Sequence, residues 1–257
     1  MTDIEQKIES LDTSLFHHVL AASSLGDRTS LLLLQRCVRR LGDYVYLEIG
    51  SYLGGTIQQI LVDRRCQLIY SVDKRPAIQA DEMRGEGSYA NNSTQQMMDG
   101  LRNAFPEIQL EIIKTFESDA SKLDPAQFIP KPNFCFIDGE HTNRAVLSDF
   151  SFCLEISAPD AVIALHDANI IYGSLPLIKR RLRGRQWQGF LLRDNVYVFL
   201  LERAIDRFRS EIRQFSLPEV PYFRRAKWRM FWVRLALGKR FVLARRIWRV
   251  AKKAIGR

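Results

Sequence analysis

The chain has 257 residues, of which 46% are hydrophobic, so it can form one sizeable α/β domain with an appendage, and global disorder is excluded. Residues 216–257 hold thirteen Lys and Arg against one acid, a net charge of +12, whereas residues 1–215 hold twenty-five bases and twenty-eight acids, a net of −3. The sequence therefore predicts a mildly acidic domain that continues into a strongly basic tail.

Targeting signals are not expected in this sequence. No charged-then-apolar segment with a small-residue cleavage site occurs near residue 1, so we expect no signal peptide. No run of about eighteen apolar residues occurs, which argues against a membrane-spanning helix. The four cysteines form no CxxC pair, and we expect them to be reduced thiols of a cytoplasmic protein; they are Cys37, Cys66, Cys135 and Cys153.

Residues 1–43 are predicted to be helical. The segments 4–11, 16–22 and 29–42 carry apolar residues at spacings of three and four, and Gly42 is a plausible helix stop. His17 and His18 lie in this region, and we interpret them as structural.

From residue 44 onward, short apolar runs alternate with helix-like segments. The runs are continuous, as is typical of strands covered on both faces. They span 44–50, 67–73, 110–116, 133–139 and 161–167, and the helix-like segments span 56–64, 93–105, 143–156 and 174–184. This repetition predicts a doubly wound, Rossmann-like, mostly parallel sheet.

Two segments depart from the repetition. Residues 189–203 hold two β-rich runs around Arg193, Asp194 and Asn195, which predicts an antiparallel hairpin that closes a seven-stranded sheet. Residues 76–93 are polar and contain glycine. Because this segment is too long for an ordinary connection, we expect a lid or a substrate loop there.

Acidic residues follow the carboxyl ends of the predicted strands. In such a sheet, ligands bind beyond these ends, where the strand order reverses. A single Asp at a strand end often only caps the next helix. Acids at five successive strand ends indicate a ligand site; they are Glu48, Asp73, Asp119, Asp138 and Asp167.

The turn after the first strand discriminates between nucleotide ligands. Asp73 ends the second strand, where a carboxylate can accept both hydroxyls of a ribose. The dinucleotide fingerprint is GxGxxG, but here three residues separate Gly50 from Gly54, and Tyr52 replaces the middle glycine. A tyrosine there would obstruct a pyrophosphate, so an NAD-dependent oxidoreductase is the less favoured alternative.

Four motifs carry a family resemblance. LEIGSYLGGT (47–56) and YSVDKRP (70–76) resemble the first and second motifs of class I methyltransferases that use S-adenosyl-L-methionine (SAM), and FESDASKL (116–123) resembles their adenine segment. FIDGEHTNRAVLSDF (136–150) followed by ALHDAN (164–169) resembles the branch of small-molecule and sugar O-methyltransferases and cephalosporin hydroxylase-like proteins. The resemblance covers roughly residues 44–203.

The resemblance implies roles for the acids and the glycine turn. Glu48 would offset the positive methionine end of SAM, Asp73 would hold the ribose, and Asp119 would meet the adenine amino group. Backbone N–H groups of the turn would bind the methionine carboxylate at a helix N-terminus. The turn residues assigned to the cofactor are Gly50, Ser51, Gly54 and Thr56.

The resemblance also implies a catalytic group. Related O-methyltransferases often hold a divalent ion between acids at the positions of Asp138 and Asp167, so Mg²⁺ or Mn²⁺ is expected there. His166 stands beside Asp167, where the family often has a further acid or amide, and Mg²⁺ prefers oxygen ligands. His141 or His166 is therefore the alternative, as a general base. Asp149 is interpreted as a packing or capping acid.

The basic tail predicts a second binding surface. An amphipathic helix with tryptophans and many bases is typical of a helix that lies in an anionic membrane interface. The alternatives are packing on its own domain or on a partner subunit; nucleic acid is not expected, since the domain is acidic. The apolar stripe is Trp228, Phe231, Trp232 and Leu235, then, after a break near Gly238, Phe241, Ala244, Ile247, Trp248, Ala251 and Ile255.

Together these patterns predict a cytoplasmic SAM-dependent O-methyltransferase, peripheral on the inner membrane. Its acceptor would be a hydroxyl of a sugar or other small metabolite, either free or lipid-linked. The predicted segments are 1–43 (helical), 44–203 (SAM-binding) and 204–257 (basic tail). A cephalosporin hydroxylase-like protein and a non-catalytic, membrane-recruited binding protein are the alternatives, and a homo-oligomer is left open.

Overall fold

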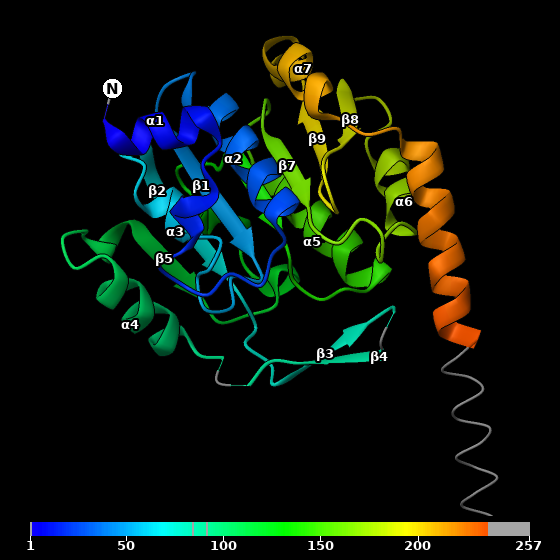
Figure 1. Ribbon diagram of the computed structural model, residues 1–257, viewed down its shortest axis with the longest axis horizontal. Helices are drawn as coiled ribbons and strands as arrows, with labels where there is room; N and C mark the ends of the chain where they lie inside the picture. Colours follow the sequence, from blue (N-terminus) through cyan, green and yellow to red (C-terminus); the bar gives the residue numbers. More distant parts are fainter. Residues whose placement is uncertain (1, 84, 91, 236–257) are drawn as a thin grey trace, which may run out of the picture.

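A computed structural model describes residues 2–83, 85–90 and 92–235, and its centre is a seven-stranded sheet (Figure 1). The sheet order is β5-β2-β1-β6-β7-β9-β8. Five strands are parallel, and β9 is antiparallel to both β7 and β8, which confirms the predicted fold class. The strands are β1 (Tyr44–Ile49), β2 (Cys66–Val72), β5 (Ile113–Phe116), β6 (Phe134–Ile137), β7 (Val162–Leu165), β8 (Trp187–Leu191) and β9 (Tyr197–Leu201).

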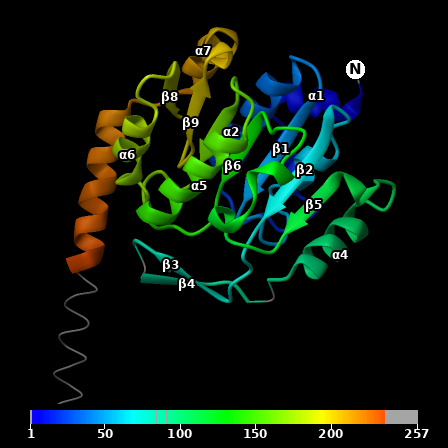
Figure 2. The same ribbon diagram turned by 180° about the vertical axis from the view of Figure 1, so that it is seen from behind.

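Helices cover both faces of the sheet (Figures 1 and 2). Because side chains alternate along a strand, Tyr44 and Tyr46 of β1 enter one hydrophobic cluster, and Val45 and Leu47 enter the other. The α-helices are α1 (Asp3–Ser10), α2 (Leu25–Arg39), α3 (Gln58–Leu61), α4 (Thr94–Ala104), α5 (Asn143–Ile156), α6 (Ser174–Arg181) and α7 (Arg203–Phe215). Short 3-10 helices are η1 (Thr13–Phe16), η2 (Leu110–Ile112), η3 (Ala120–Lys122) and η4 (Pro125–Gln127).

The N-terminal region is helical in α1 and α2, but the predicted helix over 16–22 is wrong. His18 N and Val19 N both donate to Gln58 Oε1, at 3.0 and 2.9 Å, and Gln58 Nε2 donates to the carbonyl of Val19 at 2.7 Å. The Gln58 side chain thus binds backbone groups of His18 and Val19, which would otherwise form hydrogen bonds within a helix. α2 buries residues 31–34 in the same cluster as Tyr44, so the N-terminal region shares the core of the sheet.

Two predicted boundaries in the sheet domain need correction. Residues 110–112 form η2, not the start of a strand, because the edge strand β5 pairs only with residues 69–72 of β2. The helix predicted over 56–64 is a single turn, α3.

The predicted lid over 76–93 contains strands that the sequence did not indicate. β3 (Ile78–Asp81) and β4 (Gly85–Ser88) form an antiparallel hairpin that lies across the carboxyl ends of the parallel strands (Figure 1). Asp81 forms an isolated bridge with His141, and Glu82 N donates to the His141 carbonyl at 3.0 Å. The hairpin is therefore fastened to the loop between β6 and α5.

The C-terminal region divides into two helices. α7 buries Ala204, Phe208 and Ile212 on the sheet, so it belongs to the domain. A second helix spans 219–235 and runs alongside α6 (Figures 1 and 2). The part of the predicted tail over 236–257 lies outside the described residues. No helix in the described part of the chain is long and apolar enough to cross a membrane.

Candidate active site

Two adjoining cavities open at the carboxyl ends of the parallel strands, where β1 has β2 on one side and β6 on the other. This is the point at which the strand order reverses. The first cavity has a volume of about 370 Å³ and the second about 420 Å³. Both are lined by Gly50, Asp73 and Gln79, so a ligand in one can meet a ligand in the other.

The glycine turn after β1 is held by Asp73. Its two carboxylate oxygens accept the N–H groups of Tyr52 at 2.9 Å and Arg75 at 2.8 Å. Gly50 has a φ of +90°, and a Cβ there would lie 2.2 Å from the carbonyl oxygen of Asp138. The close approach of this turn to the end of β6 therefore requires glycine at position 50.

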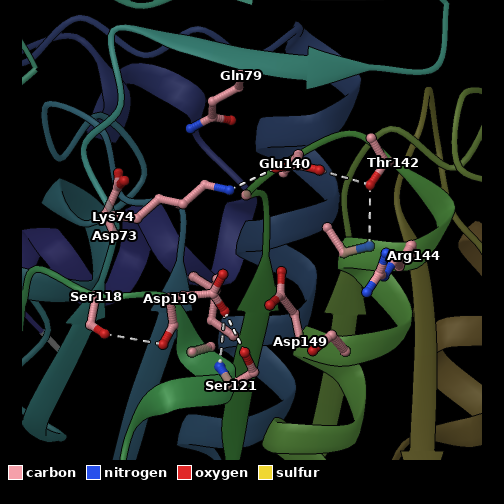
Figure 3. A pocket seen from close by; sticks show the side chains of 16 residues that line it. Asp73, Lys74, Gln79, Ser118, Asp119, Ser121, Glu140, Thr142, Arg144 and Asp149 are labelled. Atoms are coloured by element: carbon pink, nitrogen blue, oxygen red, sulfur yellow. Dashed lines mark hydrogen bonds and ion pairs between the residues drawn. The ribbon is translucent and has the colours of Figure 1, made fainter.

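Three of the seven residues predicted to bind the cofactor line the first cavity: Gly50, Asp73 and Asp119 (Figure 3). Asp119 accepts the Ser121 N–H at 3.1 Å and the Ser121 hydroxyl at 2.7 Å, and these bonds lower the pKa of its carboxyl. Lys74 and Glu140 form an ion pair of 2.6 Å at the opposite side of the cavity.

The other four, Glu48, Ser51, Gly54 and Thr56, line neither cavity. The Glu48 carboxyl is fully buried, where it accepts the Tyr46 hydroxyl at 2.7 Å and the Thr56 hydroxyl. Burial raises the pKa of Glu48 to about 8. Its predicted role beside the methionine end of the cofactor stays a prediction.

The four predicted catalytic residues all line the second cavity. His166 Nδ1 lies 2.8 Å from Asp138 Oδ1 and 3.8 Å from Asp167 Oδ2. His141 Nε2 lies 3.4 Å from each of the same two oxygens. Each of the two imidazoles thus lies within 4 Å of both carboxylates, at the ends of β6 and β7.

His166 is enclosed by acids on both sides. Its Nε2 lies 3.1 Å from Asp27, a buried residue in the first turn of α2. Burial lowers the pKa of His166, but the carboxylates of Asp138 and Asp27 outweigh it, and the pKa lies well above its usual range. For Asp138, burial raises the pKa, but His166 and His141 outweigh burial and bring it to about 2.

His141 is the more open of the two imidazoles. Its side chain is 16% exposed, against 9% for His166. Its Nδ1 lies 3.5 Å from Asp81 on the hairpin, which leaves Nε2 directed at Asp138 and Asp167. Burial lowers the pKa of His141, but Asp138 and Asp167 outweigh it, so the pKa is raised.

Comparison with known proteins identifies the domain. Residues 47–168 match the family model of a methyltransferase domain, across the glycine turn and all four residues of the second cavity's cluster. Residues 47–168 therefore form a methyltransferase domain, as the sequence motifs predicted.

Solved structures share the fold of this methyltransferase at low sequence identity. CalS11, a calicheamicin methyltransferase, has a TM-score of 0.51 and 11% identity over 78% of this chain and 92% of that one. MycE, a methyltransferase of mycinamycin biosynthesis in complex with Mg, SAH and mycinamycin VI, has a TM-score of 0.51 and 15% identity. The match to MycE covers 77% of this chain and 55% of that chain. No curated protein matches the sequence.

The expected metal ligands of the methyltransferase lie together, but the donor set does not fit magnesium. Asp138 and Asp167 face one another across the imidazoles of His141 and His166. Mg²⁺ takes oxygen ligands in an octahedron, whereas two of the four donors here are nitrogen. The expectation of a divalent ion, Mg²⁺ or Mn²⁺, stays a prediction, and we derive the chemistry from the side chains alone.

Three acids of the site were not singled out from the sequence as site residues. The pattern around Asp27 indicates only a helix start, because Ser24 and Asp27 form a capping box at the beginning of α2. Asp81 lies in the polar segment that was read as a loop, and no pattern there predicted its place beside His141. Asp149 was interpreted as a packing or capping acid, yet it lines the first cavity (Figure 3).

Proposed function

We propose that this methyltransferase transfers the methyl group of SAM to a hydroxyl of a sugar or other small metabolite. The proposal rests on one observation, the meeting of two cavities at Gly50 and Asp73. The first cavity offers acids suited to a ribosyl adenine. The second offers imidazoles held by carboxylates, which can take the proton of a hydroxyl.

In this proposal the first cavity holds the nucleoside of SAM. Asp73 accepts the ribose hydroxyls and Asp119 accepts the adenine amino group, since both are acids that line this cavity. SAM supplies a methyl group on a positively charged sulfur. The cavities meet at Gly50, so this methyl group can face an acceptor in the second cavity.

His141 is the proposed general base. Its Nε2 takes the proton of the acceptor hydroxyl, and the oxygen then forms a bond to the methyl carbon as the carbon–sulfur bond breaks and its electron pair stays on sulfur. Asp138 and Asp167 hold the ring and stabilise its protonated form, each at 3.4 Å from Nε2. His166 acts as a fixed neighbour, since its Nδ1 pairs with Asp138 at 2.8 Å and its Nε2 lies 3.1 Å from Asp27.

The acceptor class is supported by the size and chemistry of the second cavity. Its volume of about 420 Å³ suits a small molecule, and Ser24, Tyr52 and Asn92 line it together with the four catalytic candidates. The fold neighbour MycE is a methyltransferase whose structure holds mycinamycin VI, a small molecule, together with Mg. From MycE we carry over to this chain only the class of acceptor, a small molecule.

We further propose that the protein is cytoplasmic and peripheral on an anionic membrane, where its acceptor can be lipid-linked. The helix over 219–235 packs on the domain through the buried Ala226 and Met230. At 100° per residue, Trp228, Phe231 and Trp232 lie on the opposite side, and they are 60%, 58% and 55% exposed. Their ring centroids lie 5.6–6.5 Å apart, so they form one aromatic patch.

Bases surround this aromatic patch. Each base near an anionic bilayer contributes about 1 kcal/mol, and tryptophan rings anchor such a helix at the level of the headgroups. The bases in this helix are Arg224, Arg225, Lys227, Arg229 and Arg234.

The double substitution Trp228→Ser and Trp232→Ser is expected to lower binding to anionic vesicles by at least about tenfold, because two interfacial anchors are lost. Co-sedimentation with vesicles that contain anionic lipid measures this, and zwitterionic vesicles test the contribution of charge. Leu41→Ser, at an exposed site on another part of the surface, is the matched control and is expected to bind like the unmodified chain. Equal binding by the double variant and the unmodified chain would instead favour a partner subunit or nucleic acid.

Titration calorimetry with S-adenosylhomocysteine (SAH) tests the methyltransferase function. We expect the calorimetry to show one binding site per chain. In a separate reaction with SAM, we expect the mass of the acceptor to increase by one methyl group in place of a hydrogen. A mass increase of one oxygen would indicate the hydroxylase alternative, and absence of SAH binding would favour a non-catalytic binding protein.

A further inference from the structure

Asp149 is a buried acid that neither the fold nor the proposed reaction uses. It lies on α5, is 7% exposed and lines the first cavity. Figure 3 shows its side chain between Asp119 and Arg144, directed into the cavity. Among the described residues, no hydrogen bond or ion pair holds its carboxyl. A buried carboxyl without a partner costs stability, so its position calls for a ligand.

Charged groups from three elements face this carboxyl. Asp119 follows β5, Glu140 follows β6, and Lys74 follows β2. Burial raises the pKa of Asp149, Asp119 and Glu140 raise it further, Lys74 opposes them, and the pKa lies at about 7. Arg144 also lines the cavity. Around neutral pH, Asp149 is therefore available as a neutral acid, beside an ionised Asp119.

The two acids differ in what they offer a ligand. An ionised carboxylate such as Asp119 only accepts hydrogen bonds, whereas a neutral carboxyl both donates and accepts. The edge of adenine places an amino donor next to a ring nitrogen that accepts. A cavity that presents one accepting acid and one donating acid is complementary to that edge.

We infer that Asp149 donates its O–H to a ring nitrogen of the adenine of SAM, while Asp119 accepts from the amino group. This inference rests on the proposed binding of SAM in the first cavity. Asp149 is then a specificity-determining residue, since a base without this pairing of donor and acceptor leaves one of the two buried acids unpaired.

The inference makes SAH affinity depend on pH in a defined direction. Ionised Asp149 cannot donate, so affinity falls as the pH rises through about 7. If only the neutral form binds, the loss between about pH 6 and about pH 8.5 reaches about thirtyfold. Glu48, with a pKa of about 8, also titrates in this range, so the contribution of Asp149 has to be isolated by substitution.

Calorimetry with SAH at the two pH values, on the full chain, tests the inference. Asp149→Asn keeps a donor at every pH, so its SAH affinity is expected to vary by less than about threefold between the two values. Asp149→Leu removes the donor and is expected to bind about tenfold more weakly than the unmodified chain at the lower pH. Glu155→Gln, at an exposed acid of the same helix, is the matched control and is expected to keep the full pH dependence.

The possible results separate this inference from the proposed function. If the unmodified chain binds SAH but Asp149→Asn loses affinity with pH to the same extent, the inference is overturned and the function stands. If the unmodified chain does not bind SAH at either pH, the proposed function itself fails. Thermal unfolding of each variant shows whether a loss of affinity reflects loss of folding.

Discussion

Replacing His141 with Gln is expected to lower kcat by about a hundredfold to ten thousandfold, while SAH affinity changes by less than about twofold. Gln keeps most of the side-chain volume but cannot take the acceptor proton. His141 lines only the second cavity, so the substitution leaves the lining of the first cavity, the proposed nucleoside site, unchanged. Steady-state kinetics with a methyl acceptor and calorimetry with SAH measure the two quantities separately.

The pH profile gives this prediction a second readout. A general base acts only when it is neutral, and Asp138 and Asp167 raise the pKa of His141 above its usual range despite its burial. We therefore expect kcat to rise with pH through a value above about 6.5, and this rise to be lost in His141→Gln.

His17→Gln is the matched control for this substitution, because His17 is exposed and lies outside both cavities. It is expected to match the unmodified chain in kcat and in pH profile. If the His141→Gln variant kept full kcat, another group would have to take the proton of the acceptor hydroxyl, and the proposed mechanism would be wrong.

Replacing Gly50 with Ala is expected to weaken SAH binding by at least about a hundredfold. The added Cβ would lie 2.2 Å from the Asp138 carbonyl oxygen, and the neighbouring atom is backbone, which cannot rotate away. The turn must move away from the end of β6, and the wall that both cavities share moves with it. The left-handed backbone at this position adds about 1 kcal/mol of strain.

A second glycine distinguishes the effect of a left-handed backbone from the effect of a steric clash. Gly42 also has a positive φ, +126°, but a Cβ there meets nothing within 4 Å. Gly42→Ala is therefore expected to lower the free energy of unfolding by about 1 kcal/mol and to leave SAH affinity unchanged. Calorimetry and chemical denaturation of both variants make the comparison. Equal SAH affinities in the two variants would contradict the role assigned to the close approach at Gly50.

The grouping of the four catalytic candidates was predictable from the sequence for a physical reason. Carboxyl ends of neighbouring parallel strands meet at one edge of a sheet, so residues that follow β6 and β7 must lie close together. The same rule placed Asp73 beside Gly50, since β1 and β2 are paired. The continuous apolar runs identified the central parallel strands because burial on both faces favours apolar residues at most positions.

Contacts between residues far apart in the sequence were not predictable in this way. Asp27 meets His166 across 139 positions, through a helix whose packing depends on the whole core. The hairpin of β3 and β4 has polar strands that lack an apolar pattern, and its attachment to His141 involves backbone groups that any sequence provides.

The sequence by itself determined the sheet, its closing hairpin and the acids at the strand ends, because these depend on local apolar patterns and on the geometry of parallel strands. Only the tertiary structure decided which acids face a cavity. Glu48 lies behind the turn with its carboxyl bound to Tyr46 and Thr56, whereas Asp149 points into the first cavity. The direction of a side chain relative to a cavity depends on the packing of neighbouring elements, which no local pattern encodes.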